Sequence, residues 1–346
     1  MTNGTYKRMT FDLQDLLADP PPLSVTPLIK VVGLTKRYGK LVALDEVSFE
    51  VEPGAIFGFV GPNGAGKTTT LKILATLLDP SEGWATIDGY DVTRQASRVR
   101  DVIGYMPDFF GVYDDLTVLE YLDFYASTQG VKHRGREKLL HDLLTLVDLE
   151  GKRNAYVESL SRGMKQRLCL ARCLVHDPKV LLLDEPASGL DPRARVEMRE
   201  LLKELQRMGK TILISSHILP ELAELCTQIG IVDHGRFIVG GTVAEVQRRF
   251  GRKPLLRIRL LPPDPLVRSQ SEQLELTRNL LNFRTGTKAQ VNVAQGEVVT
   301  VFNGNDFDLR QLLVALIKED LPIIGFSLEY SNLEEIFLDL TALKPM

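Results

Sequence analysis

The sequence predicts an α/β fold with a mostly parallel core sheet, followed by a smaller α+β region. Two observations predict the first part. Short β-rich runs alternate with helical stretches between residues 28 and 250, and one glycine-rich loop stands between a strand and a helix. A third observation predicts the second part, because after Gly251 prolines punctuate the chain and the order of elements becomes β-α-β-β-α-β.

Apolar and β-branched runs predict the strands of the first part. They are Leu28–Val32, Val47–Val51, Ala55–Val60, Val102–Tyr105, Val180–Asp184, Thr211–Ser215 and Ile229–Asp233. Apolar residues at helical spacing predict the helices Thr68–Leu77, Val118–Gln129, Arg136–Val147, Met164–Val175 and Arg193–Met208. Residues 109–158 carry few strand signals and are predicted to form a helical insertion within a domain of residues 28–250.

Residues 251–346 are predicted to form a second, ferredoxin-like α+β domain. Its elements are expected at Leu255–Leu261 (strand), Glu272–Leu281 (helix), Gln290–Ala294 and Val298–Phe302 (strands), Phe307–Ile317 (helix) and Ile323–Leu328 (strand). A hairpin turn at Ala294–Glu297 and a helix N-cap around Asn305 are expected within it. A final helix is predicted at Asn332–Leu340. Residues 1–27 are predicted to be an N-terminal extension, either a flexible or loosely docked tail, which the pattern favours, or a segment with a short amphipathic helix at Phe11–Ala18.

Composition argues against several classes of protein. The 346 residues hold 42 Lys and Arg against 45 Asp and Glu, a net charge of −3, which argues against a protein that coats nucleic acid. Three cysteines are too few for a disulfide framework and fit a reducing cytoplasm. No apolar run approaches the roughly 18 residues of a membrane span, and no secretory signal is visible.

Residues 61–68, GPNGAGKT, match the phosphate-loop pattern G-x-x-x-x-G-K-[ST]. A buried strand precedes this segment and a helix follows it, which is the arrangement that phosphate binding requires. Glycines let consecutive backbone N–H groups face phosphate oxygens, and the helix N-terminus adds partial positive charge. Lys67 supplies a full charge for the β- and γ-phosphates, Thr68 can ligate Mg²⁺, and Thr69 can reach the α-phosphate.

Two further strands end in polar residues that suit hydrolysis. Asp184 and Glu185 follow the apolar run Val180–Leu183, at the edge of the sheet where ligands bind in α/β proteins. Asp184 suits Mg²⁺ binding through water, and Glu185 suits a general base that polarises the attacking water. His217 ends another strand and is expected to contact a γ-phosphate.

Residues 160–167, LSRGMKQR, closely resemble the signature motif of ABC ATPases, usually written LSGGQ. Ser188–Asp191 resembles the D-loop of this family, and Tyr38 stands where the family stacks an aromatic ring on adenine. The resemblance covers residues 28–245. It implies a P-loop NTPase fold of the ABC type, with an antiparallel β subdomain and a helical insertion beside the parallel core, and an ATPase that uses ATP and Mg²⁺.

The resemblance also implies a set of site residues. The expected nucleotide-binding residues are Tyr38, Gly61, Asn63, Gly64, Ala65, Gly66, Lys67, Thr68, Thr69, Asp108, Ser161, Gly163 and Asp191. The expected catalytic residues are Lys67, Glu185 and His217, and the expected metal ligands are Thr68, Asp108 and Asp184. In this family the signature residues bind ATP held by the other subunit, so a homodimer with two sandwiched nucleotides is expected.

Two residues depart from the family pattern. Asp108 stands where glutamine is commoner, and its shorter side chain lacks an amide donor. Arg162 replaces a glycine of the signature motif, where it is expected either to bring positive charge to the partner's phosphates or to point to solvent. Both variants resemble those of the drug- and polysaccharide-exporter branch, so neither is expected to inactivate the protein.

The resemblance implies a separate multi-span membrane permease as the partner, with the ATPase on the inner face of the cell membrane. The partner's coupling helices are expected to dock on Phe109, Phe110, Val112 and Tyr113, and the alternative is that these residues belong to an ordinary core. Ser327–Phe337 resembles the C-terminal segment of ABC-2 type exporter ATPases, which implies export. The alternative is a soluble ABC ATPase that acts on ribosomes or DNA. Residues 255–346 are expected to serve either regulatory dimerisation or partner binding, and both readings stay open.

Overall fold

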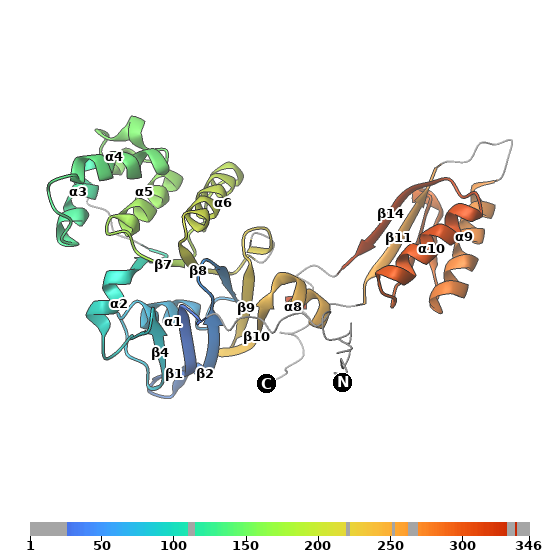
Figure 1. The fold of residues 1–346 in the computed structure, drawn as a ribbon, viewed down its shortest axis with the longest axis horizontal. Helices are drawn as coiled ribbons and strands as arrows, with labels where there is room; N and C mark the ends of the chain where they lie inside the picture. Colours follow the sequence, from blue (N-terminus) through green and yellow to red (C-terminus); the bar gives the residue numbers. More distant parts are fainter. Residues whose placement is uncertain are drawn as a thin grey trace, which may run out of the picture.

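The structure is a computed structural model, and it describes residues 26–109, 115–218, 222–250, 253–261, 269–330 and 336–337. Figure 1 shows three groups of elements along the chain. Strands β1 to β10 and helix α1 form the body, helices α3, α4 and α5 gather at one end of it, and helices α9 and α10 lie with their own strands at the far end. The predicted helix at Phe11–Ala18 lies outside the described residues.

The body contains two sheets. A six-stranded sheet has the order β10-β9-β3-β8-β7-β6, with β10 antiparallel to β9 and the other neighbours parallel. Its strands are β3 (Ile56–Val60), β6 (Ile103–Met106), β7 (Val180–Asp184), β8 (Thr211–Ser216), β9 (Gln228–Asp233) and β10 (Arg236–Thr242). An antiparallel four-stranded sheet has the order β2-β1-β4-β5, from β1 (Ile29–Tyr38), β2 (Leu41–Val51), β4 (Glu82–Ile87) and β5 (Tyr90–Asp91).

Continuous apolar runs explain the core of the six-stranded sheet. Every residue of β3, β7 and β8 is buried, as expected for parallel strands that are covered on both faces. The parallel arrangement brings the carboxyl ends of β3, β7 and β8 to one edge, where the glycine-rich loop, Glu185 and His217 follow directly. The predicted α/β class with a parallel core is therefore confirmed.

The helices of the body and of the helical segment are α1 (Lys67–Leu74), α2 (Ala96–Val102), α3 (Val118–Thr128), α4 (Arg136–Leu146), α5 (Arg162–Leu174), α6 (Pro192–Arg207) and α8 (Val243–Phe250). Polar side chains cap the N-termini of α3, α5 and α6. Thr117 and Glu120 form a reciprocal capping box at the start of α3. Ser161 caps α5 and Asp191 caps α6, each accepting a backbone N–H three residues ahead.

The C-terminal elements form a separate antiparallel sheet of order β12-β13-β11-β14. Its strands are β11 (Leu255–Leu260), β12 (Gln290–Asn292), β13 (Glu297–Val301) and β14 (Ile323–Glu329), and its helices are α9 (Gln270–Thr285) and α10 (Asp306–Lys318). Asn305 caps α10 in a capping box with Asp308, at the expected break. Apolar residues of these elements, including Leu256, Leu274 and Leu316, form their own buried cluster.

Several elements differ from the sequence-based prediction. The prediction omitted β4, β5, α2, β10 and α8. In β4 only Ala85 and Ile87 are buried, and β10 contains two adjacent glycines, so neither strand has a continuous apolar run. Ala294 was expected in a strand, but it lies in a 3₁₀ helix, Val293–Gln295, that leads into the turn at Gly296. Of the predicted final helix only Ile336 and Phe337 are described, and they are helical.

Candidate active site

The carboxyl-end edge of the six-stranded sheet borders a cavity of about 440 Å³, called here the Lys67 cavity. It is lined by Tyr38, Leu41, Ala43, Asn63, Gly64, Gly66, Lys67, Thr68, Thr69, Asp108, Glu185, Ser188 and His217. Residues from five separate stretches of sequence thus meet at one place. Most of the residues expected from the phosphate-loop and strand-end arguments are among them.

The glycine-rich loop is shaped by two left-handed glycines. Gly64 has φ +85° and Gly66 has φ +101°, which residues with a Cβ rarely adopt. A Cβ on Gly66 would also lie 2.5 Å from Leu44 Cδ2 and 2.8 Å from the Ala43 carbonyl oxygen. Gly66 is the N-cap of α1, so the first N–H groups of this helix face the cavity region. This is the geometry of an anion site at a helix N-terminus.

Lys67 opens α1 and is buried, with 6% of its surface exposed. Its Nζ donates to the carbonyl oxygens of Gly61 (2.6 Å) and Pro62 (3.1 Å) and lies 3.5 Å from Oε1 of Glu185. Burial lowers the pKa of Lys67 below its ordinary value of 10.5, and attraction to Glu185 offsets this only in part. The loop therefore holds one desolvated cation at its centre.

Glu185 links Lys67 to His217. Its Oε2 accepts a hydrogen bond from Nδ1 of His217 at 2.9 Å, while Oε1 faces Lys67. The residue has φ +52°, a left-handed conformation that costs energy in a non-glycine residue and recurs at active sites. Its backbone N–H donates to Oγ of Ser215 at 3.0 Å. The carboxylate is thus held at the end of β7 and aimed into the cavity.

Asp184 lies beneath Glu185 and is almost fully buried. Its Oδ1 accepts a hydrogen bond from Oγ of Ser215 at 2.6 Å, and its buried Oδ2 has no protein partner. An unpaired buried carboxylate oxygen next to the hydroxyl-bearing Thr68 loop fits water-mediated binding of Mg²⁺. Among the described residues no three His, Cys, Asp or Glu side chains gather as a metal cluster, so the protein alone offers few ligands.

The open side of the cavity is formed by the β1–β2 hairpin. Tyr38, at the end of β1, is half-exposed and lines the cavity together with Leu41 and Ala43 of β2. The Nζ of Lys36 lies 5.3 Å from the centroid of the Tyr38 ring. An aromatic face beside a phosphate loop provides a stacking surface for a flat ring such as adenine.

Five of the predicted nucleotide-binding residues do not line the Lys67 cavity. Gly61 and Ala65 belong to the loop but are buried beneath its surface. Ser161, Gly163 and Asp191 line a different recess of about 300 Å³, called here the Ser161 recess, which also includes Arg162 and Gly189. Within one chain, the structure therefore does not bring the signature residues to the phosphate loop.

Sequence reasoning missed Leu41, Ala43 and Ser188 as cavity residues and Ser215 as a partner of Asp184. Ser215 could have been found, because it ends the strand that precedes His217 and β8 is the neighbour of β7. Leu41 and Ala43 gave no chemical signal, since both are ordinary apolar residues of a strand.

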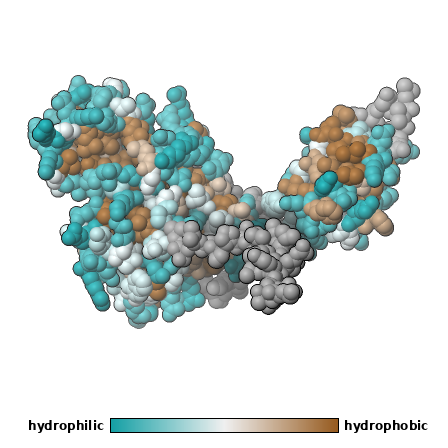
Figure 2. All heavy atoms as spheres, in the orientation of Figure 1, coloured by the Kyte–Doolittle hydropathy of each residue, from teal (hydrophilic) through white to brown (hydrophobic). Residues whose placement is uncertain are grey.

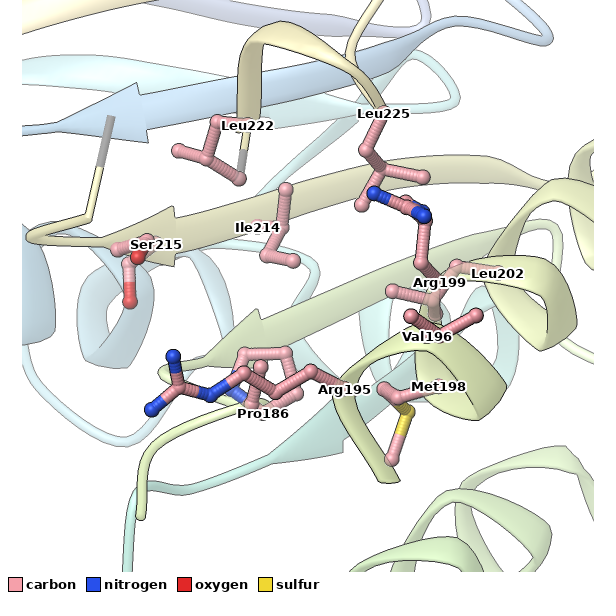
Figure 3. Close-up of a pocket in the computed structure, with 12 residues that line it drawn as sticks. Pro186, Arg195, Val196, Met198, Arg199, Leu202, Ile214, Ser215, Leu222 and Leu225 are labelled. Atoms are coloured by element: carbon pink, nitrogen blue, oxygen red, sulfur yellow. The ribbon is translucent and has the colours of Figure 1, made fainter. Parts of the chain in front are cut away.

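A second, apolar cavity of about 70 Å³ lies behind the site (Figure 3). Pro186 and Ser215 border it on the side of Glu185, while Val196, Met198 and Leu202 of α6 close the other side. Its volume is far below that of the Lys67 cavity, so it is too small for a nucleotide.

Comparison with known proteins decides the family. Residues 44–188 match the family model described as ABC transporter. Over 327 residues the chain is 35% identical to the Nod factor export ATP-binding protein I of Ralstonia nicotianae, covering 93% of this chain and 96% of the relative. The chain belongs to the ABC transporter ATP-binding family. As an ABC ATPase it binds and hydrolyses ATP, and the predicted family and enzyme class are confirmed.

Other relatives of this ABC ATPase place it near exporter subunits. It is 34% identical to the daunorubicin/doxorubicin resistance ATP-binding protein DrrA of Streptomyces peucetius, covering 91% of this chain and 93% of that one. It is 28% identical to the linearmycin resistance ATP-binding protein LnrL of Bacillus subtilis, covering 91% and 98%. These alignments extend beyond the ATP-binding region into the C-terminal elements.

Solved structures agree on the ATP-binding fold. The solved structure of an ATP-binding subunit of an ABC transporter matches with a TM-score of 0.59 and 32% identity, over 64% of this chain and 93% of that one. The structure of cbiO1 from Clostridium perfringens matches with a TM-score of 0.58 and 28% identity, over 64% and 91%. The predicted ABC-type P-loop fold is therefore confirmed. No helix among the described residues has the length and apolar character needed to cross a membrane.

Proposed function

We propose that this ABC ATPase is the ATP-hydrolysing subunit of an export complex and energises a separate multi-span membrane permease. The meeting of Lys67, Glu185 and His217 in one cavity carries the proposal, because these groups suit phosphate binding and water activation. The names of its relatives, which include a Nod factor export protein and two drug-resistance proteins, support the export direction.

ATP fits the Lys67 cavity with its phosphates on the glycine-rich loop. The N–H groups at the start of α1 and the Lys67 ammonium bind the β- and γ-phosphates, and Thr69 binds the α-phosphate. To do so, Lys67 exchanges its contacts with Glu185 and the loop carbonyls for phosphate oxygens. The ring of Tyr38 stacks on adenine at the open side.

Glu185 acts as the general base on the attacking water. Its carboxylate faces the cavity, and its pairing with His217 at 2.9 Å orients one oxygen while leaving the other able to accept a proton when Lys67 turns to phosphate. His217 is half-exposed on the cavity wall and contacts the γ-phosphate, so it senses whether the phosphate is present. Lys67, Glu185 and His217 are thus the proposed catalytic residues.

Mg²⁺ is assigned to Thr68, Asp184 and Asp108. Thr68 and Asp108 both line the cavity, and the free Oδ2 of Asp184 would bind the ion through water. Bound Mg²⁺ neutralises charge on the phosphate oxygens. Ser215 keeps Asp184 in place through the 2.6 Å hydrogen bond to Oδ1.

A homodimer completes each site. Ser161 and Gly163 lie at the N-terminus of α5, an anion-binding position, yet they line a recess apart from their own phosphate loop. In the proposed dimer they bind the γ-phosphate of ATP held by the other copy. Asp191 lies in the same recess and is assigned to the dimer contact. ATP then closes the dimer and hydrolysis reopens it.

The helical segment is the proposed docking surface for the permease. Figure 2 shows an apolar area over the part of the molecule that carries α3, α4 and α5. Phe109, Phe124 and Tyr156 are exposed in this segment, and Phe109 has 89% of its surface accessible. Predicted groove residues Phe110, Val112 and Tyr113 lie outside the described residues. Docking there would hold the ATPase on the inner face of the cell membrane, without nucleic acid as a partner.

Two domains are proposed for the chain. Residues 28–250 form the nucleotide-binding domain, with 109–158 as its helical subdomain, and residues 251–346 form a second domain. The separate apolar cluster and the β-α-β-β-α-β order of the C-terminal elements support this division. Residues 1–27 are the N-terminal extension.

Affinity purification from detergent-solubilised membranes tests the proposal. The tagged chain is expected to bring down a multi-span membrane protein in stoichiometric amount, and Phe109→Ser is expected to reduce its recovery. Phe283→Ser is the control, because Phe283 is similarly exposed, at 85%, but lies on α9. Recovery of ribosomal or DNA-bound proteins without a membrane protein would contradict the proposal. Equal loss with both variants would contradict docking on the helical segment.

A further inference from the structure

Arg162, the residue that departs from the signature motif, lies against Gly189 of the same chain. A Cβ built on Gly189 would stand 2.4 Å from Cζ, 2.5 Å from Nη1 and 2.7 Å from Nη2 of Arg162. The guanidinium group therefore occupies the space that any side chain at position 189 would need. Gly189 also has φ +67°, a conformation that suits glycine.

Two more contacts join the same two segments. Nε2 of Gln166, a buried side chain of α5, donates to the Ser188 carbonyl oxygen at 3.2 Å. Gly163 is packed so closely that a Cβ there would lie 3.3 Å from Ala194 Cβ and 3.6 Å from Leu190 Cδ2. The first turns of α5 thus contact the loop 188–191 through Arg162 and Gln166, and Gly163 leaves little room for a side chain beside Leu190 and Ala194.

This attachment connects the two recesses of one chain. Ser188 lines the Lys67 cavity, whereas its neighbours Gly189, Leu190 and Asp191 line the Ser161 recess. The loop begins three residues after Glu185, and the Ser188 N–H donates back to the Glu185 carbonyl oxygen at 3.0 Å. A shift of the loop therefore reaches the catalytic carboxylate on one side and the signature turn on the other.

We infer that Arg162 is a positioning residue whose guanidinium packs on Gly189 and fixes the signature turn, Ser161–Met164, relative to the D-loop, Ser188–Asp191. This inference rests on the proposed dimer function, in which both segments face the partner's nucleotide. It differs from direct phosphate binding, because the guanidinium is engaged with its own D-loop. The contact uses a planar guanidinium group, which can lie flat on a glycine backbone. Lysine has no planar group.

The test compares Arg162→Ala, Arg162→Lys, Gly189→Ala and the double variant Arg162→Ala/Gly189→Ala in the full-length chain. Arg207→Ala is the matched control, since Arg207 lies on α6 outside the recess, pairs with Glu204 and is 66% exposed. Steady-state ATP turnover and nucleotide binding are measured for each. Hydrogen exchange of the backbone amides of the D-loop is measured without nucleotide.

Arg162→Ala is expected to lower kcat by about tenfold with unchanged binding of ATP to the monomer, because misplacement by about 1 Å can cost about 100-fold. The kcat of Arg162→Lys is expected to fall by the same factor. The kcat of the double variant is expected to be no lower than that of the more impaired single variant. Faster exchange of D-loop amides is expected in Arg162→Ala but not in Arg207→Ala.

Turnover preserved by Arg162→Lys would assign the residue to charge recognition and overturn the inference. The inference would also be overturned if the fold-losses in ATP turnover of Arg162→Ala and Gly189→Ala multiply in the double variant, because the two residues would then act separately. If the wild-type chain hydrolyses no ATP, the proposed function fails. The exchange experiment then decides the Arg162 contact by itself, and unchanged D-loop exchange would overturn it.

Discussion

Lys67 and Glu185 form an ion pair in the cavity, with Nζ 3.5 Å from Oε1. The two residues come from the start of α1 and the end of β7, and neither is freely exposed to solvent. In this arrangement the cation of the phosphate loop is held by the carboxylate that is proposed to activate water. Nucleotide binding is therefore proposed to replace the Glu185 carboxylate beside Lys67 by phosphate oxygens. Glu185 is then free to activate water.

Lys67→Ala is expected to lower ATP turnover by at least about 100-fold, since loss of one preorganised group at developing charge typically costs that much. A phosphate-release assay measures the effect. Lys72→Ala serves as the control, because Lys72 is exposed on the same helix. Wild-type turnover in Lys67→Ala would remove Lys67 from the phosphate site.

Asp108→Gln is expected to change nucleotide affinity by less than about tenfold, because Asp108 is proposed to reach Mg²⁺ through water, whereas the loop amides and Lys67 supply the direct phosphate contacts. Titration with a fluorescent ATP analogue measures the affinity in the presence of Mg²⁺. A loss of tenfold or more, about 1.4 kcal/mol, would instead make Asp108 a direct ligand.

Ser215→Ala is expected to destabilise the fold. The hydroxyl donates to Oδ1 of Asp184, so its removal leaves this buried carboxylate without that hydrogen bond, whereas the Glu185 N–H keeps the Ser215 carbonyl oxygen at 3.3 Å. A buried polar group costs about 1–3 kcal/mol when unsatisfied. Urea unfolding measures the free energy of unfolding, with Ser327→Ala on the exposed side of β14 as the control. Equal stability of the two variants would contradict this role.

Arg257→Leu is expected to destabilise the C-terminal sheet in a pH-dependent way. Arg257 on β11 bonds to Glu297 on β13 and to Glu329 on β14, and hydrogen bonding to Arg257 lowers the pKa of Glu329 below 4.5. A lowered carboxylate pKa stabilises the fold above 4.5, and this contribution is lost as the pH falls through the native pKa.

The difference in thermal midpoint between wild type and Arg257→Leu should therefore be largest near neutral pH and shrink below pH 4.5. Arg259→Leu, an exposed neighbour on β11, is the control. A difference that stays constant with pH would show that the ion pairs with Arg257 contribute nothing to stability.

The elements that sequence predicted correctly are those with a continuous or periodic apolar signal. Continuous apolar runs predict strands β3, β7 and β8, and every residue of these strands is buried. Apolar residues at helical spacing predict helix α5, which buries one face. Strands β4 and β10 were missed, because their stability comes from pairing with β1 and β9 rather than from an apolar pattern of their own.

The chemistry of the cavity could be predicted where it follows strand ends and glycine spacing, as at Lys67, Glu185 and His217. Contacts between side chains across the cavity could not be predicted, because no sequence pattern indicates the left-handed φ of Glu185 or its ion pair with Lys67. The orientation of Arg162 was likewise open in the sequence. Its packing on Gly189 depends on a loop that lies 27 positions away in the chain.

The role of Glu185 is tested most directly by the rate of phosphate release by purified Glu185→Gln, measured beside wild type and the exposed control Glu200→Gln. Loss of a general base costs about 10²–10⁴-fold. A fall of this size is expected in Glu185→Gln, with ATP still bound and dimers that form only with ATP. Glu200→Gln should match wild type. Normal hydrolysis by Glu185→Gln would contradict the central claim that Glu185 activates the attacking water.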